Sequence, residues 1–493
     1  MDAKLSKPPI ARAGRKLAWL WLAVVGLVLA QCTSTSIPTQ QVSLSEPPRQ
    51  AEIPPAVQRE HQRILAAYGG TYDDPRLESL VNQTVAKLVA ASERPDLNYR
   101  VTVLNSAAVN AFALPTGQLY VTRGLIALAN DSSELASVLS HEMAHVVARH
   151  AAIREDKARQ VALVSRVISD VLTDPGSGAL ALAKSKIALA SFSRAQEFEA
   201  DGIGVGIAAR AGFDPYGAVR FLTAMGRNGE LKPAGRTHID PRAPDFLSSH
   251  PATPERVRNA RNSARQHTAP GSGNRDRDAY LGAIDGLVYG EDPSEGFVRG
   301  RRFLHSKLGF TFVAPEGFVL DNTAQAVLGV RENGGQALRL DVVRVPAEQS
   351  LRDYLTSGWI ESIDPKTVEE ITINGFPAAT AIAKGDQWSF RLYAVRFGSD
   401  VYRFIYAAKN KTPEVDRTFR ESVRTFRRMT LAEIEAAKPL RLRVVTVAPG
   451  DTVERLASRM AVADKQVERF RVLNNLDPNA RVKPGDSVKI VTE

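Results

Sequence analysis

The chain of 493 residues contains one cysteine and only eight histidines. A single cysteine excludes a framework of intramolecular disulfides and a zinc cluster made of several thiolates. A metal site in this chain must therefore be built from histidine and carboxylate side chains. Glycine and proline, at 34 and 28 residues, are too few for a collagen-like or low-complexity chain. The length allows about two to four domains, each large enough to bury a core.

The chain also lacks a long uncharged hydrophobic run beyond its first thirty residues. In those thirty, five basic residues and one acidic residue accompany the apolar run 17–30. This layout is typical of an export signal and predicts a signal peptide at residues 1–31. The formal net charge of +10 by itself suggests an anionic partner. Because part of it belongs to this signal, and no aromatic stacking platform accompanies the rest, we expect no nucleic-acid partner.

Cys32 directly follows the apolar run, in Leu29-Ala30-Gln31-Cys32. This resembles the lipobox of bacterial lipoproteins, although Gln31 stands where a small residue is usual. The resemblance implies a periplasmic protein with a lipid anchor at Cys32, and Thr33 after the cysteine favours the outer membrane. An uncleaved N-terminal anchor is the alternative. Residues 32–56, rich in Ser, Thr, Gln and Pro, are predicted to form a flexible tether.

Composition divides the remainder into three globular segments. Residues 57–265 are followed by a polar linker at 266–276, a second segment at 277–430 and a compact unit at 442–491. In the second segment, alternating side chains predict strands at 388–397 and 401–406, and a helix follows at 412–425. This segment has no convincing catalytic set, so we predict an α+β domain of unknown role.

The first segment alternates predicted helices and strands. Asp74-Pro75 begins a helix, and strands are expected at 99–103 and 118–122. A capping box, Asp131-Ser-Ser-Glu134, begins a long helix that contains His141-Glu142-Met143-Ala144-His145.

Within this helix, His141 and His145 are four residues apart and face the same side, so they can share one metal ion. Glu142 projects beside them and can act on a water without being a ligand. A catalytic zinc site commonly has three protein ligands.

Two candidates exist for the third ligand. Glu197 and Asp201 are four residues apart on a second predicted helix, which makes Glu197 a ligand and lets Asp201 orient a ligand imidazole. Glu199 points to the opposite side and is expected to be solvated. His150 would suit a metzincin, but on a continuous helix it points away from His141, so we predict a surface histidine.

These motifs, together with residues 105–117 and 248–256, resemble the zinc metallopeptidases related to HtpX and the CAAX prenyl proteases. The similarity is greatest to their periplasmic lipoprotein branch, of the BepA and LoiP type. It implies a mainly helical zincin-type domain with a small sheet, a Zn²⁺ cofactor and peptide cleavage. It also implies that the backbone around Asn110 and Ala111 pairs with an extended substrate. His250 is a candidate oxyanion donor or an occluding fourth ligand in a resting state, with a capping histidine as the alternative.

The last unit carries two Pro-Gly-Asp turns on either side of an Asn-Asn-Leu corner. This pattern resembles a LysM module of strand–helix–helix–strand form, which implies peptidoglycan as ligand. By the same resemblance, two loops line the glycan groove, with Gly450, Asp451, Thr452, Asn475, Leu476 and Asp477. A module that no longer binds glycan is the alternative.

The sequence therefore predicts an α+β protein made of a zincin-type peptidase domain, a second α+β domain and a βααβ LysM module. The expected function is that of an exported zinc endopeptidase that cleaves misfolded or assembling cell-envelope proteins. Its partners would be unfolded or envelope protein substrates, peptidoglycan and the membrane. The rival hypotheses are a peptidoglycan-cutting metallopeptidase and a wall-bound chaperone or scaffold with a closed metal site.

Overall fold

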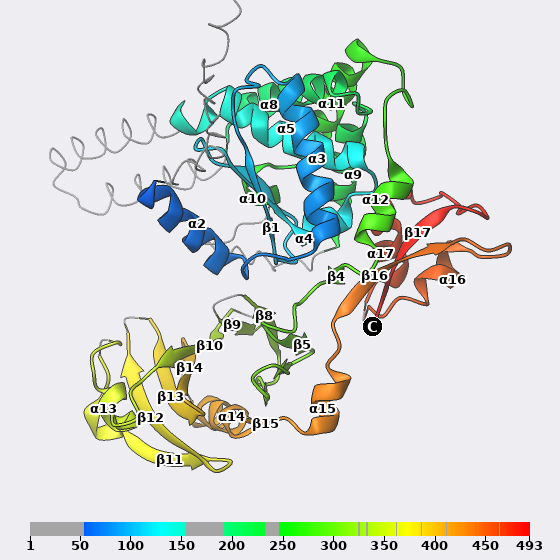
Figure 1. Cartoon of the computed structure of the whole chain (residues 1–493). Coiled ribbons are helices and arrows are strands. Elements are labelled where there is room, and N and C mark those ends of the chain that lie inside the picture. The colour runs from blue at the N-terminus through cyan, green and yellow to red at the C-terminus, as the bar shows by residue number, and fades with distance from the viewer. Residues whose placement is uncertain are drawn as a thin grey trace, which may run out of the picture. The chain divides into compact units, whose positions relative to one another are not determined.

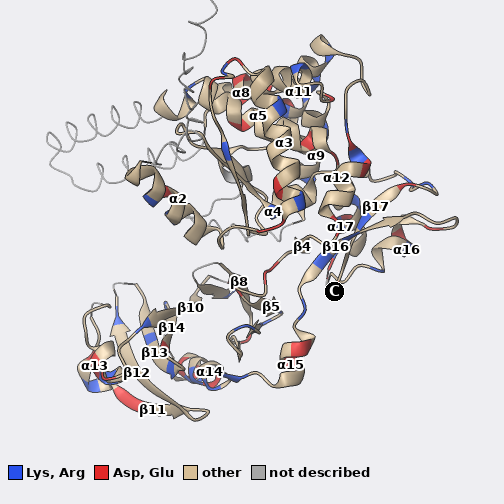
Figure 2. Ribbon diagram, viewed as in Figure 1, with Lys and Arg blue, Asp and Glu red and all other residues tan. Residues whose placement is uncertain are grey.

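The computed structural model describes residues 54–153, 192–231 and 246–493, apart from positions 324, 325, 332, 333, 361, 386, 411 and 463. The predicted signal peptide, Cys32 and the predicted tether as far as residue 53 lie outside the described residues. Within the described ranges, no helix is long and apolar enough to cross a membrane. Figure 2 shows acidic and basic residues interspersed along the described helices and strands.

The first segment contains helices and strands, but the predicted alternation is wrong: in the described residues the three strands follow one another, with helices before and after them (Figure 1). Its elements in chain order are α2 (Pro55–Ala67), α3 (Pro75–Ala91), β1 (Arg100–Leu104), β2 (Ala111–Ala113), β3 (Gln118–Thr122), α4 (Arg123–Leu128), α5 (Ser132–Val147), α8 (Arg194–Arg210), α9 (Gly217–Glu230), α10 (Phe246–Ser249) and α11 (Pro254–His267). Asp74 caps α3 by accepting a hydrogen bond from the Arg76 N–H, and Pro75 occupies the first helical position. A proline fits there because that N–H has no partner within the helix.

The small sheet has the strand order β1-β3-β2. β3 is buried along its whole length, pairs in parallel with β1 and pairs antiparallel with β2. The edge strand β2 also packs against α5. The sheet edge therefore lies next to the helix that contains the two predicted histidine ligands.

The helix α5 is the centre of this segment, because every residue from Ser132 to His145 is buried. α3, α8 and α9 pack against it, and α11 packs against α8 and α9 (Figure 1). Gly204 lets α8 approach closely, since a Cβ there would lie 2.9 Å from the backbone nitrogen of His141. This glycine keeps the carboxylates of α8 within reach of the histidines of α5.

The second segment is an α+β domain with its own aromatic core. Its strands form one sheet in the order β11-β12-β13-β14-β10-β9-β8 and another in the order β15-β7-β6-β5. These strands are β5 (Phe297–Arg299), β6 (Arg302–His305), β7 (Phe310–Val313), β8 (Phe318–Asn322), β9 (Val327–Arg331), β10 (Gln336–Arg344), β11 (Glu369–Ile373), β12 (Phe376–Lys384), β13 (Ser389–Phe397), β14 (Asp400–Ala408) and β15 (Arg427–Arg428). The helices are α13 (Leu351–Leu355), the 3₁₀ turn η1 (Pro365–Thr367), α14 (Pro413–Arg424) and α15 (Leu431–Ala436). The predicted hairpin, β13 and β14, and the predicted helix, α14, are confirmed.

The last unit has the predicted strand–helix–helix–strand order. It consists of β16 (Leu440–Thr446), α16 (Val453–Ala457), α17 (Gln466–Leu473) and β17 (Ser487–Thr492). β16 pairs antiparallel with β17 on one side and with β4 (Val288–Tyr289) on the other. Its apolar side chains, among them Leu456 and Phe470, belong to the same buried cluster as Leu135 and Leu139 of α5. The unit is therefore not packed separately from the first segment.

The predicted start of the second domain at residue 277 is wrong in this structure. The helix α12 (Arg277–Ile284) contributes Tyr280, Leu281 and Ile284 to the cluster shared by the first and last units. The preceding linker is also bonded to the first segment, since the N–H of Ser132 donates to Arg275 O at 2.9 Å. Composition alone did not reveal this packing, because the apolar residues of α12 are too few to identify their partner.

Candidate metal centre

The N-terminus of α5 differs in one detail from the predicted capping box. Asp131 Oδ1 accepts a hydrogen bond from the Glu134 N–H at 2.9 Å, as predicted. Glu134 Oε2, however, accepts from the N–H of Asn130, one residue before the cap, at 2.9 Å. Both carboxylates are buried, so the start of the helix is anchored inside the protein.

Four buried side chains from three parts of the chain meet beside α5. They are His141 and His145 of α5, Glu197 of α8, and His250, which follows α10. One ligand atom from each lies within 4.8 Å of the other three. The structure thus brings together the three predicted metal ligands and the candidate fourth one.

The spacing of these atoms suits a tetrahedral ion. His141 Nε2 lies 3.1 Å from His145 Nε2, 3.3 Å from His250 Nδ1 and 3.6 Å from Glu197 Oε2. Four ligands at the usual zinc distances would be about 3.3 Å apart. Burial, reinforced by neighbouring positive groups, lowers the pKa of His145, so its imidazole is neutral and able to bind a cation. The residues present therefore fit a zinc ion.

Asp201 and Arg256 support the ligands from behind. Asp201 Oδ1 lies 3.0 Å from His141 Nδ1, which leaves His141 Nε2 directed at the other ligands. The Arg256 guanidinium donates to both oxygens of Asp201, at 2.8 and 2.7 Å, and lies 2.7 Å from Glu197 Oε2. Burial alone would raise the pKa of Asp201, but the hydrogen bonds from Arg256 and His141 lower it to about 2. The predicted position of Asp201 is thus the one observed.

Sequence reasoning missed the role of Arg256. It belongs to the residue 248–256 motif, but an arginine at the start of a helix usually lies in solvent. Here Arg256 is buried. Burial lowers its pKa, but the neighbouring Asp201 and Glu197 raise the pKa by more. The signal in the sequence was the pair of acidic residues on α8, which require a buried counter-charge.

Glu142 lies beside the ligand group without belonging to it. It is buried, and among the described residues its Oε1 has no hydrogen-bond partner. Burial raises its pKa well above the usual value, and the charge of Glu197 adds to this shift. The charge of Arg256 and a hydrogen bond from the backbone N–H of Ala113 act to lower this pKa. A carboxyl group with a raised pKa at this position can both accept and return a proton near neutral pH.

The prediction that His150 is a surface histidine is wrong. α5 ends at Val147, and Arg149 has a positive φ of 55°, which turns the chain back. His150 is therefore buried, with its Nδ1 2.9 Å from Nδ1 of His145 and its Nε2 3.3 Å from Glu199 Oε2. It contacts a ligand but is outside the ligand group, while Glu199 is exposed as predicted.

Residues 75–264 match peptidase family M48, and residues 445–491 match the LysM domain. The first segment is an M48 peptidase domain. The beta-barrel assembly-enhancing protease of Escherichia coli K12 is 31% identical over 213 residues, which are 41% of this chain and 42% of that protein. The protein of the same name from Yersinia pestis is 31% identical over 202 residues, 39% and 40% of the two chains. The mitochondrial metalloendopeptidase OMA1 of Schizosaccharomyces pombe is 31% identical over 108 residues, 21% and 32% of the two chains. The match spans less than half the length of each of these relatives.

The predicted peptide-pairing residue Asn110 is already paired within the M48 domain. Its N–H donates to Thr122 Oγ1, and its carbonyl accepts from the Thr122 N–H, both at 3.0 Å. The prediction for Asn110 is therefore wrong in this structure. Backbone groups alternate in direction along an antiparallel strand, so those of Ala111 and Ala113 face away from β3.

The two predicted glycan loops of the LysM domain have different surroundings. Gly450 and Thr452 are exposed, and Asp451 accepts a hydrogen bond from the Ala448 N–H. The second loop contacts α9 of the M48 domain: Asn475 Nδ2 donates to Arg220 O, and Arg227 donates to Leu476 O and to Asp477. The M48 domain thus takes part in the surroundings of the predicted groove.

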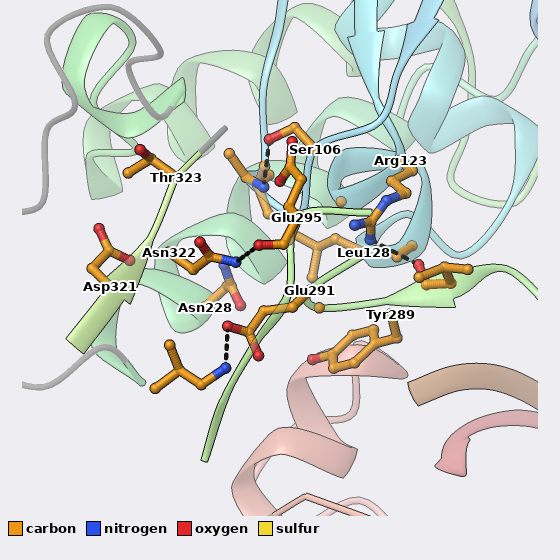
Figure 3. A pocket seen from close by; sticks show the side chains of 18 of the residues that line it. Ser106, Arg123, Leu128, Asn228, Tyr289, Glu291, Glu295, Asp321, Asn322 and Thr323 are labelled. Carbon is orange, nitrogen blue, oxygen red and sulfur yellow. Dashed lines mark hydrogen bonds between the residues drawn. The ribbon is translucent and has the colours of Figure 1, made fainter. Parts of the chain in front are cut away.

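A separate cavity of about 690 Å³ is lined by residues of all three domains (Figure 3). Ser106 and Arg123 of the M48 domain face Glu291 and Glu295, which lie between β4 and β5. Burial raises the pKa of both carboxyl groups to about 7 from a usual value near 4.5, and Asp292 adds to the shift of Glu295.

These raised pKa values predict a pH-dependent stability. Between pH 4.5 and 7 the folded protein retains protons that the unfolded chain releases, so stability falls as pH rises through this window. The double variant Glu291→Gln/Glu295→Gln should gain on the order of 2 kcal/mol at pH 8 and nothing at pH 4. Thermal melts of both proteins across this range measure the difference. The exposed Glu316→Gln is the control, and a gain that does not depend on pH would contradict the assignment.

Proposed function

We propose that this chain is an exported zinc endopeptidase that cleaves misfolded or assembling cell-envelope proteins in the periplasm. A lipid on Cys32 would hold it at the outer membrane, and the LysM domain would hold it at peptidoglycan. The observation that carries the peptidase part is the buried group of His141, His145 and Glu197 next to Glu142, whose Oε1 has no hydrogen-bond partner among the described residues. The names of the M48 relatives, which are proteases, support the reaction class.

In the proposed reaction, each residue of the site has a separate task. A zinc ion held by the ligand group would lower the pKa of a water to about 7 and polarise the scissile carbonyl. Glu142 accepts the proton of the attacking water and later delivers it to the leaving amine nitrogen. Asp201 holds His141 in the orientation that directs Nε2 at the ligand group.

The edge strand β2 is the proposed place for the substrate. An extended peptide added beside Ala111 would bond to backbone groups that face away from β3. Ala113 also directs its N–H to Glu142, so the same strand would position both the peptide and the proton carrier. This arrangement favours an unfolded substrate, because only an extended segment can add as a strand.

His250 is the proposed fourth ligand of a resting state. Its Nδ1 lies 2.9 Å from Glu197 Oε1, and its Nε2 lies 3.7 Å from Glu142 Oε1. It thus fills the side of the ligand group next to Glu142, where the water and the substrate carbonyl must enter. Displacement of His250 would open that side, and the same imidazole could then donate to the developing oxyanion.

Two substrates distinguish the proposed function from its rivals. Zinc-loaded protein is incubated separately with unfolded casein and with purified peptidoglycan sacculi. Cleavage of casein with intact sacculi is the expected result, and casein cleavage should end when a chelator is added. Release of soluble muropeptides instead of casein fragments would favour a peptidoglycan-cutting enzyme. If neither is cut, a chaperone or scaffold with a closed site replaces the proposed function.

A further inference from the structure

A buried lysine of the LysM domain is bonded to the M48 domain. Lys489 lies on β17, is fully buried, and donates through Nζ to the carbonyl oxygens of Ala127, Leu128 and Ala129, at 2.8, 3.1 and 2.7 Å. An ammonium group has three donors, and all three are used here. The three carbonyl oxygens lie at the C-terminal end of α4, where the helix dipole favours a positive charge.

The same ammonium group faces the acidic start of the active-site helix. Only Asn130 and Asp131 separate Ala129 from α5, whose buried Glu134 is attracted to Lys489. Burial lowers the pKa of Lys489 to about 7, while Glu134 and Asp131 favour its charged form and Arg277 opposes it. Burial and the neighbouring Asp131 raise the pKa of Glu134. The positive charges of Arg220 and Lys489 act to lower it.

A second bridge joins the same two segments. Arg277 of α12 donates from Nη1 to Asn130 O at 2.9 Å and from Nη2 to Ser487 O of β17 at 3.0 Å. Together with the apolar cluster that the two domains share, these bonds join β17 to the segment 127–134. A module attached through a flexible linker would not need buried polar bonds of this kind.

We propose that the LysM domain is a built-in clamp on the M48 domain, with Lys489 as the residue that positions the start of the active-site helix. α5 is a rigid element that carries His141, Glu142 and His145, so a shift at its N-terminus moves all three relative to Glu197 on α8. This inference rests on the proposed peptidase function for its catalytic consequence. It also implies that a wall-bound LysM domain holds the active site directly and not through a mobile tether.

The test is a double-mutant cycle between the two domains. Lys489→Met leaves Glu134 without one of its positive partners and removes the ammonium donor from three carbonyls, of which Leu128 O retains a bond from Asn130 Nδ2. We expect it to lower kcat on unfolded casein by about tenfold to a hundredfold with little change in KM, and to weaken zinc binding by about tenfold. Glu134→Gln in the same chain removes the buried charge and should restore most of the loss. Lys483→Met, at an exposed position of the same domain, is the control and should behave as the wild type.

Zinc affinity from chelator competition and amide exchange of segment 127–135 give readouts that do not depend on cleavage. They test the clamp even if the wild-type protein cuts no substrate, which would overturn the proposed function alone. A folded Lys489→Met protein with wild-type zinc affinity and exchange would overturn the clamp. If Lys489→Met does not fold, the double variant decides: recovery supports the clamp, and an equally unfolded double variant refutes it.

Discussion

Glu142→Gln should lose cleavage of unfolded casein by a factor of about 10³ or more while it retains its metal. Glutamine has the size of glutamate but cannot accept a proton from the attacking water or return it to the leaving amine. The Glu142 oxygens are outside the group of ligand atoms, so the substitution leaves zinc binding intact. Single-turnover cleavage and the metal content of the purified protein measure the two effects.

Glu199→Gln is the matched control for this prediction. Glu199 is a carboxylate of α8 close to the site, but it is exposed, and the residue it contacts among those described is His150. Its substitution should leave the cleavage rate within about twofold of the wild type. Zinc-dependent cleavage that survives in Glu142→Gln would remove Glu142 from its proposed role. The same variant expressed in cells would retain uncleaved substrates and so identify them.

Arg256→Met should destabilise the metal-free protein by about 3–5 kcal/mol. The guanidinium is the shared partner of two buried carboxylates, Glu197 and Asp201, and methionine fills similar space without the charge. Both carboxylates would then lie buried without their main counter-charge. Added zinc should recover part of the loss, because the ion supplies positive charge to Glu197.

Thermal melts with and without zinc measure this effect. Arg261→Met is the control, since Arg261 lies on the same helix α11 and is exposed. Equal melting temperatures for Arg256→Met and Arg261→Met would show that Arg256 does not support the two carboxylates. If added zinc does not reduce the loss of stability in Arg256→Met, the role of Arg256 is in the packing of α11 instead.

The site was predictable from sequence wherever its geometry is local. His141 and His145 face one way because four residues make about one helical turn, and the same holds for Glu197 and Asp201. The capping signal at Asp131 located the helix itself. The position of His150 was not predictable in this way. The prediction assumed a continuous helix, but the helix ends at Val147 and Arg149 has a positive φ.

The errors elsewhere concern contacts between distant segments. Asn110 was proposed for substrate from its place in a motif, but its backbone groups bond to Thr122, twelve residues later. The last unit was predicted to be compact by itself, because its pattern of turns is complete within fifty residues. Its core is nevertheless shared with α5, and Lys489 bonds across more than 350 residues of sequence. The hydrophobic periodicity of a segment does not show which distant segment it will contact.

By itself, the sequence determined the histidine pair of the candidate metal site, the neighbouring glutamate, the second acidic helix and the order of the three segments. These features depend on spacing along one helix or on turns between adjacent elements, and such spacing is written in the chain. Only the tertiary structure decided that Arg256 joins Glu197 to Asp201, that His250 lies within the ligand group and that Lys489 joins the LysM domain to the end of α4. Buried charges require partners, but packing chooses which distant residue supplies them.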